Sequence, residues 1–324
     1  MILAGDIGGT SARLALFNGH GGRLETVRSQ TFASANYPGL SAVVQEFLAA
    51  GPETIQRACF GIAGPVRQGR AVTPNLPWVV DASVLSRDLD VRPIALLNDL
   101  EANAYGIAAL EPEDFVTLNP GTPGVQGNRA VIAVGTGLGE AGLYWDGRNH
   151  IPFPCEGGHA DFAPRYNLEA ELMLYLRGKF DHVSYERVLS GRGLQNIYEF
   201  LRDARHGVES PEVAEQMRRS DPAAVIANSA LNERCGLCAQ ALDLFVSLYG
   251  AEAGNLALKM MAAGGVFIGG GIAPKIIKKL KGPAFMAAFS AKGRMQPLLD
   301  AIPVRVIMKD TAALLGAARY AAAL

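Results

Sequence analysis

The sequence predicts an α/β protein. Short apolar runs typical of buried strands alternate along the chain with longer segments whose apolar residues have helical spacing. Three of the apolar runs end in glycine-rich turns, at residues 5–10, 135–137 and 269–271. The first two turns are each followed by a returning apolar run, so one strand–turn–strand unit occurs twice. We therefore expect an internal duplication and a ligand that is gripped from several sides.

The first third of the chain is expected to hold five strands and two helices. Pro38 introduces the first helix, and Ala63-Gly64-Pro65 ends the fourth strand. The expected strands are Ile2–Ile7, 11–17, 24–32, Arg57–Ile62 and Ile94–Asn98, and the expected helices are Leu40–Ala49 and 99–109.

The pattern restarts after a connector that contains glycine and proline, at residues 121–128. Strands are expected at 130–134 and 140–145, on either side of the second glycine turn. Residues 168–263 have mostly helical periodicity. The remaining expected elements are a strand at 266–268, a helix after Pro274, a strand at Val304–Ile307 and a closing helix at 311–322.

Length and composition indicate a globular protein of about two domains. The 324 residues are 49% hydrophobic and 19% charged, which is enough apolar material for large cores. The net charge of −1 gives no basic excess, so we expect no nucleic-acid or membrane partner. Asp6 interrupts the first apolar residues, which argues against a signal peptide. We expect a soluble, cytoplasmic protein.

The four cysteines are too few for a disulfide framework in a chain of this length, which favours a reducing compartment. Cys235 and Cys238 form a CxxC pair, but no second pair at zinc-binding spacing accompanies it. An apolar, strongly helical stretch begins at this pair. We expect both cysteines to be small core residues rather than a redox or metal site.

The first glycine turn, Gly5-Asp-Ile-Gly-Gly-Thr10, has the composition of a phosphate-binding loop. Glycines let the backbone approach a phosphate closely, with several N–H groups pointing one way. Thr10 adds a hydroxyl, Arg13 adds a cation, and Asp6 could hold Mg²⁺ through water. Gly135-Thr136-Gly137 offers a second cradle. Either turn alone is better explained as an ordinary hairpin turn, but two such turns after buried strands favour phosphate binding.

Other nucleotide-binding patterns are not matched. Residues 135–139 lack the GxGxxG spacing of a dinucleotide fingerprint and precede an expected strand instead of a helix. The chain has no GxxxxGK[ST] loop and lacks the protein-kinase motif set. A NAD-dependent oxidoreductase is therefore only a distant alternative.

Three polar clusters accompany the glycine turns. Asn98-Asp99 lies where a strand gives way to a helix, an edge where ligands gather in open sheets, although either residue could simply cap the helix. The segment at 156–161 carries Glu, His and Asp around two glycines, and suits hydroxyl groups better than a metal because no partner ligand cluster is found elsewhere. A polar surface loop is the plain alternative. The third cluster holds Glu186. Its structural alternative is that Ser184 is an N-cap and that Glu186 only stabilises the N-terminus of the same helix.

These segments together resemble bacterial glucokinases of the group distinct from the ROK proteins, and the resemblance runs nearly end to end. The EGGH and ERVLSG segments, at 156–159 and 186–191, are specific, whereas each glycine turn alone is weak. The resemblance is carried by Gly5-Asp-Ile-Gly-Gly-Thr10 with Arg13-Leu-Ala-Leu16, Leu97-Asn98-Asp99, Gly135-Thr-Gly-Leu-Gly139, Glu156-Gly-Gly-His159-Ala-Asp161-Phe-Ala-Pro164, His182-Val-Ser-Tyr-Glu186-Arg-Val-Leu-Ser-Gly191, Gly254-Asn-Leu-Ala-Leu258 and Gly264-Gly-Val-Phe-Ile-Gly-Gly-Gly-Ile272.

The resemblance implies a duplicated actin-like ATPase (ribonuclease H-like) fold, in which ATP and sugar occupy a cleft between two domains. The implied smaller domain covers residues 1–109 plus 309–324, and the larger domain covers 110–308. A homodimer is a further expectation from the family.

The resemblance also implies ATP- and Mg²⁺-dependent phosphorylation of D-glucose at its 6-hydroxyl, with Asp99 as the catalytic base. A helix N-terminus would help to keep Asp99 ionised. The implied sugar ligands are Asn98, Asp99, Glu156, His159 and Glu186. The implied nucleotide-binding residues are Gly5, Asp6, Ile7, Gly8, Gly9 and Thr10 in the first phosphate loop, Gly135, Thr136 and Gly137 in the second, and Gly269, Gly270 and Gly271 near the adenosine. Asp6 is also the implied indirect metal ligand.

The sequence departs from related families at a few positions. Glu140 follows the second phosphate loop, where the resembled family usually has an apolar residue. Phe162-Ala-Pro164 replaces the cysteine-rich zinc motif of ROK kinases, so zinc is not expected. A broader hexose or N-acetylhexosamine kinase of the same superfamily is the alternative activity.

Overall fold

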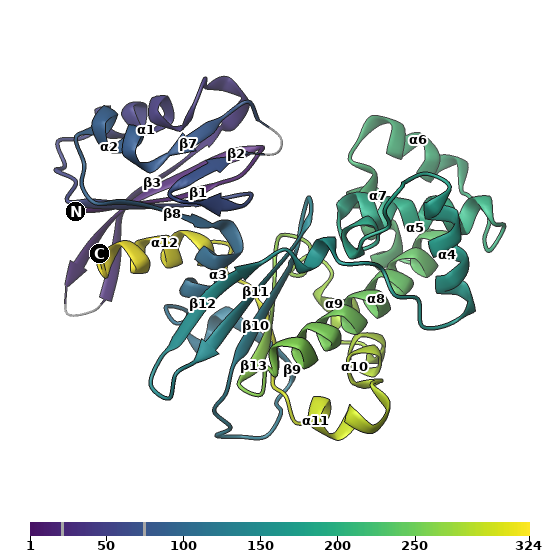
Figure 1. The fold of residues 1–324 in the computed structure, drawn as a ribbon. Coiled ribbons are helices and arrows are strands. Elements are labelled where there is room, and N and C mark those ends of the chain that lie inside the picture. The colour runs from purple at the N-terminus through teal and green to yellow at the C-terminus, as the bar shows by residue number, and fades with distance from the viewer. Residues whose placement is uncertain (21–22, 74–75) are drawn as a thin grey trace. The chain divides into compact units, whose positions relative to one another are not determined.

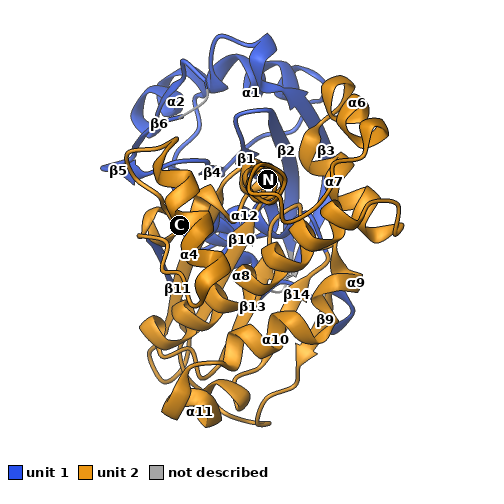
Figure 2. Ribbon diagram, turned by 90° about the vertical axis from the view of Figure 1, so that its right-hand side faces the viewer, with its two compact units in different colours: residues 1–114, 152–154, 309–324 blue, residues 115–151, 155–308 orange. Residues whose placement is uncertain are grey.

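The structure is a computed structural model that describes residues 1–20, 23–73 and 76–324 (Figure 1). The chain divides into two compact units, which Figure 2 colours separately. Unit 1 comprises residues 1–114, 152–154 and 309–324, and unit 2 comprises residues 115–151 and 155–308. These units and the domains expected from the resemblance differ in where they place residues 110–114 and 152–154.

Unit 1 is built around a five-stranded sheet, counted over the described residues, with the strand order β3-β2-β1-β4-β8. Strands β1, β4 and β8 run parallel, while β1–β2 and β2–β3 are antiparallel hairpins. The strands of this sheet are β1 (Ile2–Ile7), β2 (Ser11–His20), β3 (Arg23–Ala33), β4 (Arg57–Ile62) and β8 (Ile94–Asn98). A small second sheet contains β5 (Val66–Arg67), β6 (Arg70–Val72) and β7 (Val79–Asp81).

The helices of unit 1 cover both faces of its main sheet. They are α1 (Leu40–Ala49), α2 (Ala82–Leu89), α3 (Asp99–Ile107) and α12 (Ala312–Ala322). Alternation along β1 sends Leu3 and Ile7 into the core with α1, and Ile2 and Ala4 into the core with α12. Figure 1 shows α12 on the face opposite α1 and α2.

Helices α3 and α12 pack unusually closely because glycine occupies the contact on each. A Cβ on Gly106 would overlap the Ala312 carbonyl, and a Cβ on Gly316 would overlap the Ala102 carbonyl. This contact fixes α3, and with it the start of that helix at Asp99, against the sheet.

Unit 2 is built around a six-stranded sheet of described residues with the order β12-β11-β10-β13-β14-β9. Strands β10, β13 and β14 run parallel, and β10–β11 is an antiparallel hairpin. The strands are β9 (Phe115–Asn119), β10 (Arg129–Val134), β11 (Leu138–Trp145), β12 (His150–Cys155), β13 (Gly265–Gly269) and β14 (Val304–Ile307). Residues 152–154 of β12 are assigned to unit 1.

Most helices lie in unit 2, where the long α8 is buried along most of its length against the sheet. The helices are α4 (Asn167–Arg177), α5 (Gly191–Asp203), α6 (Pro211–Arg219), α7 (Pro222–Leu231), α8 (Gly236–Met260), α9 (Ile277–Leu280), α10 (Pro283–Ser290) and α11 (Gln296–Asp300). Short 3₁₀ turns are η1 (Ser34–Asn36), η2 (Pro112–Asp114), η3 (Gly157–His159), η4 (Tyr185–Arg187) and η5 (Gly293–Met295). None of the described helices is both long and apolar enough to cross a membrane.

The α/β class and the repeated unit are confirmed. The β1–β2 hairpin pairs in parallel with β4, and the β10–β11 hairpin pairs in parallel with β13 in the same way. The expected core role of the CxxC cysteines is also confirmed, since both are buried. Cys235 Sγ accepts a hydrogen bond from the Cys238 backbone N–H (3.1 Å) and so caps α8.

Candidate active site

Three strand ends meet at one edge of the unit 1 sheet. The pairing register aligns Ile7 with Ile62, and Ile62 with Asn98, so the turn after each strand starts at the same level. The Ala63 N–H donates to the Ile7 carbonyl (2.9 Å), and the Asn98 amide donates to the Gly64 carbonyl (3.1 Å). This edge therefore places the first glycine turn and the start of α3 in one row.

The first glycine turn is held closed by a neighbouring 3₁₀ turn. The Gly8 N–H donates to the Ser11 carbonyl (2.9 Å), and the Ser34 hydroxyl donates to the Gly8 carbonyl (2.9 Å). Thr10 is exposed and Gly8 and Gly9 are half-buried, so this end of the turn is open to a ligand. In contrast, Gly5 is buried within β1, where a Cβ would crowd Phe60.

Asp6 lies on β1 directly opposite Arg13 on β2. Burial raises the pKa of the Asp6 carboxyl, while the Arg13 guanidinium opposes that rise and Asp310 adds to it. Arg13 is itself held by Asp310, with an ion pair of 3.1 Å and a hydrogen bond to the Asp310 carbonyl (3.0 Å). Protein-bound Mg²⁺ often keeps several waters and uses one or two carboxylates beside a substrate phosphate, so Asp6 fits a water-mediated role.

Asn98 and Asp99 have different places at the start of α3. Asn98 is the N-cap, since its side-chain oxygen accepts from the Leu100 N–H (2.9 Å) and the Glu101 N–H (3.4 Å). Asp99 is the first helical residue, and its Oδ1 accepts from the Leu100 N–H (3.0 Å). The capping interpretation is therefore correct for Asn98, whose amide is largely used within the protein. Asp99 stands at the positive end of the helix dipole.

The second and third glycine turns are adjacent in unit 2. The Gly135 N–H donates to the Gly137 carbonyl (2.9 Å), and the Ile272 N–H donates to the Val134 carbonyl (3.2 Å). Gly270 has a φ of +83° and packs against the Val134 backbone, a conformation and a contact that favour glycine. The Gly191 N–H at the start of α5 donates to the Gly135 carbonyl (2.9 Å).

The two segments expected to hold the sugar are paired with each other. The Tyr185 N–H donates to the Ala160 carbonyl (3.0 Å), and the Phe162 N–H donates to the Val183 carbonyl (2.9 Å). The side chains of Glu156 and His159 are exposed on one of these segments. On the other, Glu186 is half-buried and its Oε2 accepts from the Leu138 N–H beside the second glycine turn (3.1 Å).

A buried polar network beneath these segments is not predicted by the sequence. Glu252 on α8 is fully buried and accepts from the Asn255 amide (2.7 Å), and it also interacts with the Tyr185 hydroxyl. Lys259 Nζ lies 3.4 Å from the Glu252 carboxylate. Two sequence features point to this region, the Gly254-Asn255 motif and the unusual Glu140.

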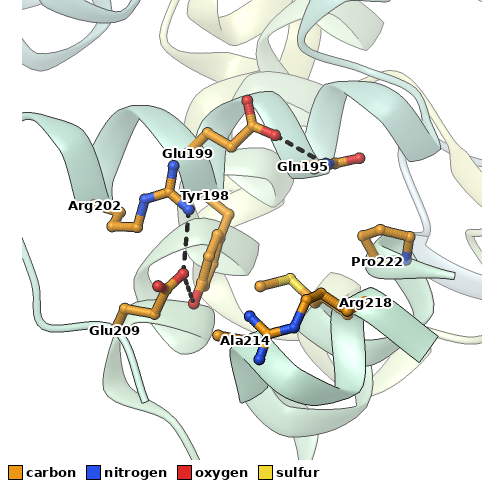
Figure 3. Close-up of a pocket in the computed structure, with 9 residues that line it drawn as sticks. Gln195, Tyr198, Glu199, Arg202, Glu209, Ala214, Arg218 and Pro222 are labelled. Atoms are coloured by element: carbon orange, nitrogen blue, oxygen red, sulfur yellow. Dashed lines mark hydrogen bonds and ion pairs between the residues drawn. The ribbon is translucent and has the colours of Figure 1, made fainter. Parts of the chain in front are cut away.

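Two surface cavities lie apart from the predicted residues. One of about 260 Å³ lies among α5, α6 and the start of α7 (Figure 3). In it the Glu209 carboxylate accepts from the Tyr198 hydroxyl and the Arg202 guanidinium, each at 3.2 Å. Another of about 1120 Å³ in unit 1 is lined by residues such as Arg57, Tyr105 and Arg319. Neither contains a predicted site residue, and across the described residues no cluster of three or more metal-ligating side chains was found.

Comparison with known proteins matches the whole chain. The glucokinase family model covers residues 3–324. The chain is 43% identical to a glucokinase of Nostoc punctiforme over 100% of this chain and 99% of the relative, and 36% identical to a glucokinase of Shigella dysenteriae over 98% and 96%. A crystal structure of glucokinase from an Antarctic psychrotroph superposes with a TM-score of 0.86 at 31% identity, covering 100% and 99% of the two chains.

More distant structures show the same fold. A ROK family glucokinase from Streptomyces griseus in complex with glucose and AMPPNP matches with a TM-score of 0.68 at 20% identity, over 100% of this chain and 99% of that one. The actin-like ATPase fold implied by the family resemblance is thus confirmed. With a family model and full-length relatives in agreement, the chain belongs to the glucokinase family.

Proposed function

We propose that this chain transfers the γ-phosphoryl group of ATP to the 6-hydroxyl of D-glucose, with Asp99 as the base. The related ROK glucokinase was crystallised in complex with glucose and the ATP analogue AMPPNP, which supports this donor and acceptor. The observation that carries the residue assignment is the common sheet edge of unit 1. There Asp99 begins α3 in the same row as the open end of the first glycine turn.

Asp99 is suited to take a proton from a sugar hydroxyl. An alcohol attacks phosphorus poorly until a carboxylate within hydrogen-bond reach accepts its proton. The N-terminus of α3 favours the ionised carboxylate, because its backbone dipoles are positive at that end. Asn98 caps the same helix and is tied to Gly64, so it keeps the position of Asp99 fixed. We assign Asn98 to a positioning role together with its role as a sugar ligand.

The residues of unit 2 recognise the sugar in this proposal. The exposed Glu156 and His159 and the half-buried Glu186 are acceptors and donors for ring hydroxyls. Glu186 also accepts from the Leu138 N–H, so the same carboxylate links the sugar segment to the second glycine turn. A buried acceptor that is left without its hydroxyl costs about 1–3 kcal/mol, which would discriminate between epimers.

The glycine turns hold the nucleotide. Backbone N–H groups of Gly8, Gly9 and Thr10 and of residues 135–137 bind the phosphates, and Gly269, Gly270 and Gly271 lie near the adenosine. When bound, Mg²⁺ supplies positive charge that neutralises the phosphate oxygens during transfer. Asp6 would hold it through water, and Arg13 lowers the pKa of Asp6 and so favours its ionised form.

Three further assignments belong to this proposal. The chain acts in the cytoplasm, forms a homodimer, and has the two domains of a sugar kinase at residues 1–109 plus 309–324 and 110–308, which correspond to units 1 and 2 except at residues 110–114 and 152–154. Sedimentation equilibrium measures the dimer directly, and a mass of one chain would refute it.

A coupled assay of the purified protein tests the activity. ATP with Mg²⁺ is compared with ADP and polyphosphate as donors, against a panel of hexoses and N-acetylhexosamines. We expect glucose with ATP to give the highest kcat/KM by at least tenfold. A higher kcat/KM for N-acetylglucosamine or mannose would favour the broader hexose or hexosamine kinase instead.

A further inference from the structure

Glu140 is a buried carboxyl group that the proposed reaction does not use. It lies on β11 directly opposite Ile132, and only 1% of its surface is exposed. Its Oε1 has no hydrogen-bond partner. Burial raises the pKa of Glu140 to about 8; the neighbouring Glu252 carboxylate adds to this rise and Lys259 opposes it. At neutral pH this side chain is therefore mainly an uncharged acid.

The groups that face Glu140 come from three elements. Helix α8 contributes Tyr249, Glu252 and Lys259, and the end of β12 contributes Cys155. The 3₁₀ turn η3 contributes Gly157, where a Cβ would overlap the Glu140 Oε2. Only Lys259 among these groups is a cation, and it pairs with Glu252 at 3.4 Å.

The Glu140–Glu252 pair is asymmetric. Glu252 has the Asn255 amide at 2.7 Å, the Lys259 ammonium at 3.4 Å and the Tyr185 hydroxyl around it. Glu140 has an oxygen without a partner and no cation of its own. Burial raises the pKa of Glu252 as well, but its hydrogen bonds and Lys259 oppose that rise. Because Glu140 lacks such donors, it is the one of the two that holds the proton more firmly.

Both carboxyl groups support segments that carry sugar ligands. Glu140 lies directly beneath η3, the turn that joins Glu156 to His159. Gly158 in that turn packs onto β11, since a Cβ there would overlap the Leu138 carbonyl. Glu252 contacts Tyr185, the residue before Glu186. The buried pair therefore lies under both halves of the sugar-binding surface.

We propose that Glu140, as an uncharged acid beside the Glu252 carboxylate, is a positioning residue that fixes η3 so that Glu156 and His159 meet the sugar. This inference rests on the proposed function and assigns a new residue to it. Loss of the proton would place two carboxylates side by side with no additional donor. Relief of that repulsion requires water or movement at η3, because Gly157 is in direct contact with the Glu140 carboxyl group. Glucose binding then weakens, while phosphoryl transfer from ATP to the bound sugar does not change.

The test compares wild type with Glu140→Gln between pH 6.5 and 9.5, measuring KM for glucose, KM for ATP and kcat. Glutamine has nearly the same shape and cannot ionise. We expect the glucose KM of wild type to rise at least fivefold between pH 7 and 9.5, with kcat and the ATP KM within twofold. In Glu140→Gln the glucose KM should change less than twofold. Glu199→Gln, which removes a carboxylate paired with Lys179 elsewhere in unit 2, should retain the wild-type profile.

The outcomes separate this inference from the proposed function. If wild type does not phosphorylate glucose at pH 7, the proposed function fails. If it does, but wild type and Glu140→Gln have parallel profiles of glucose KM against pH, the role of Glu140 is refuted. If Glu140 had a purely structural role, Glu140→Gln would have a lower kcat and lower stability than wild type, and the glucose KM of wild type would not depend on pH in this way.

A second measurement uses wild type alone, so it tests the proposal even if Glu140→Gln does not fold. Calorimetry of glucose binding to wild type at pH 8.5, in buffers of different ionisation enthalpy, counts the protons taken up. If the sugar binds better to the form with uncharged Glu140, proton linkage predicts an uptake of about 0.3 to 0.8 proton per glucose bound. No uptake would overturn the proposal.

Discussion

The two hairpins that repeat along the chain differ in which charged group neighbours their buried acid. In unit 1, the β1–β2 hairpin places Asp6 opposite Arg13, and Arg13 is anchored in turn by Asp310. In unit 2, the equivalent strand position of β10 carries Ala133, and the buried acid of the hairpin is Glu140 on β11, which has the Glu252 carboxyl group as a neighbour. Burial raises the pKa of both acids, but the first hairpin places its acid beside a cation, whereas the second places its acid beside another carboxyl group.

This difference suits what each unit contributes to the proposed reaction. Unit 1 carries the proposed base Asp99, which acts through negative charge, and Asp6, whose pKa is raised by burial and lowered by Arg13. Unit 2 carries the sugar ligands, which act through hydrogen bonds that need a fixed geometry. One strand–turn–strand scaffold can therefore serve either chemistry or recognition, depending on how its buried carboxyl group is compensated.

The largest effect is expected at the base of unit 1. Asp99→Asn should lower kcat by about 10²- to 10⁴-fold, the usual contribution of a general base. Its affinity for glucose should fall much less than kcat, because the amide oxygen can still accept a hydrogen bond from the 6-hydroxyl but cannot take up its proton. Steady-state kinetics with a binding isotherm checks both values. A variant with near-normal turnover would remove Asp99 from its role.

The next effect is a change in the free energy of unfolding caused by Glu140, the buried acid of unit 2. Below pH 4.5 Glu140 is protonated whether the chain is folded or not. Between there and about pH 8 only the folded state keeps the proton, so Glu140 lowers stability as pH rises. Glu140→Gln removes this cost and should raise the free energy of unfolding by about 3 kcal/mol at pH 7, an order-of-magnitude value.

Denaturant unfolding at pH 4.5 and pH 8 measures this difference for unit 2. We expect Glu140→Gln and wild type to converge at the lower pH. Equal stability of the two proteins at both pH values would mean that Glu140 is compensated by a cation, and the contrast between the hairpins would disappear.

A smaller effect is expected at the sugar ligands of unit 2. Glu156→Gln should raise the glucose KM by about 5- to 100-fold, as expected for the loss of a charged acceptor of 1–3 kcal/mol. Its kcat should remain within about threefold of wild type. A collapsed kcat with an unchanged KM would move Glu156 from recognition to chemistry.

The smallest effect is expected for Asp6, the acid of unit 1 that lies opposite Arg13. Arg13→Met removes the cation that opposes the raised pKa of Asp6, so Asp6 should become harder to ionise. Because the raised pKa makes stability fall as pH rises through it, the loss should be larger at pH 8 than at pH 4. We expect about 1 kcal/mol at pH 8, since the Arg13 side chain is 28% exposed. Thermal melts at the two pH values measure the loss, and a pH-independent loss would contradict it.

Much of the fold could be predicted from the sequence because its central strands are continuous apolar runs. β1, α1, β4, β8 and β14 have the predicted bounds. Strands β5 and β6 are two and three residues long, too short for a periodic signal. Strand β12 contains Pro152 and Pro154, which argue against a strand in the sequence but are tolerated at the edge of the sheet.

The candidate site was only partly predictable, because local sequence patterns do not show which distant segments meet. Asp99, Glu156, His159 and Glu186 are candidates only through the resemblance of their segments to a family, since each has an ordinary local explanation. The different positions of Asn98, the N-cap, and Asp99, the first residue of α3, could be assigned only from the hydrogen bonds at the start of the helix. The network under the sugar segments joins β11, η4 and α8, and no spacing within the chain indicates that these elements meet.

The most direct test measures the separation between chemistry in unit 1 and recognition in unit 2. Glucose Kd by calorimetry and kcat by coupled assay are determined for Asp99→Asn and Glu156→Gln under one set of conditions. We predict that Asp99→Asn loses kcat and keeps its glucose Kd, and that Glu156→Gln keeps kcat and loses affinity. The opposite pattern, or equal losses of both quantities in both variants, would contradict this separation.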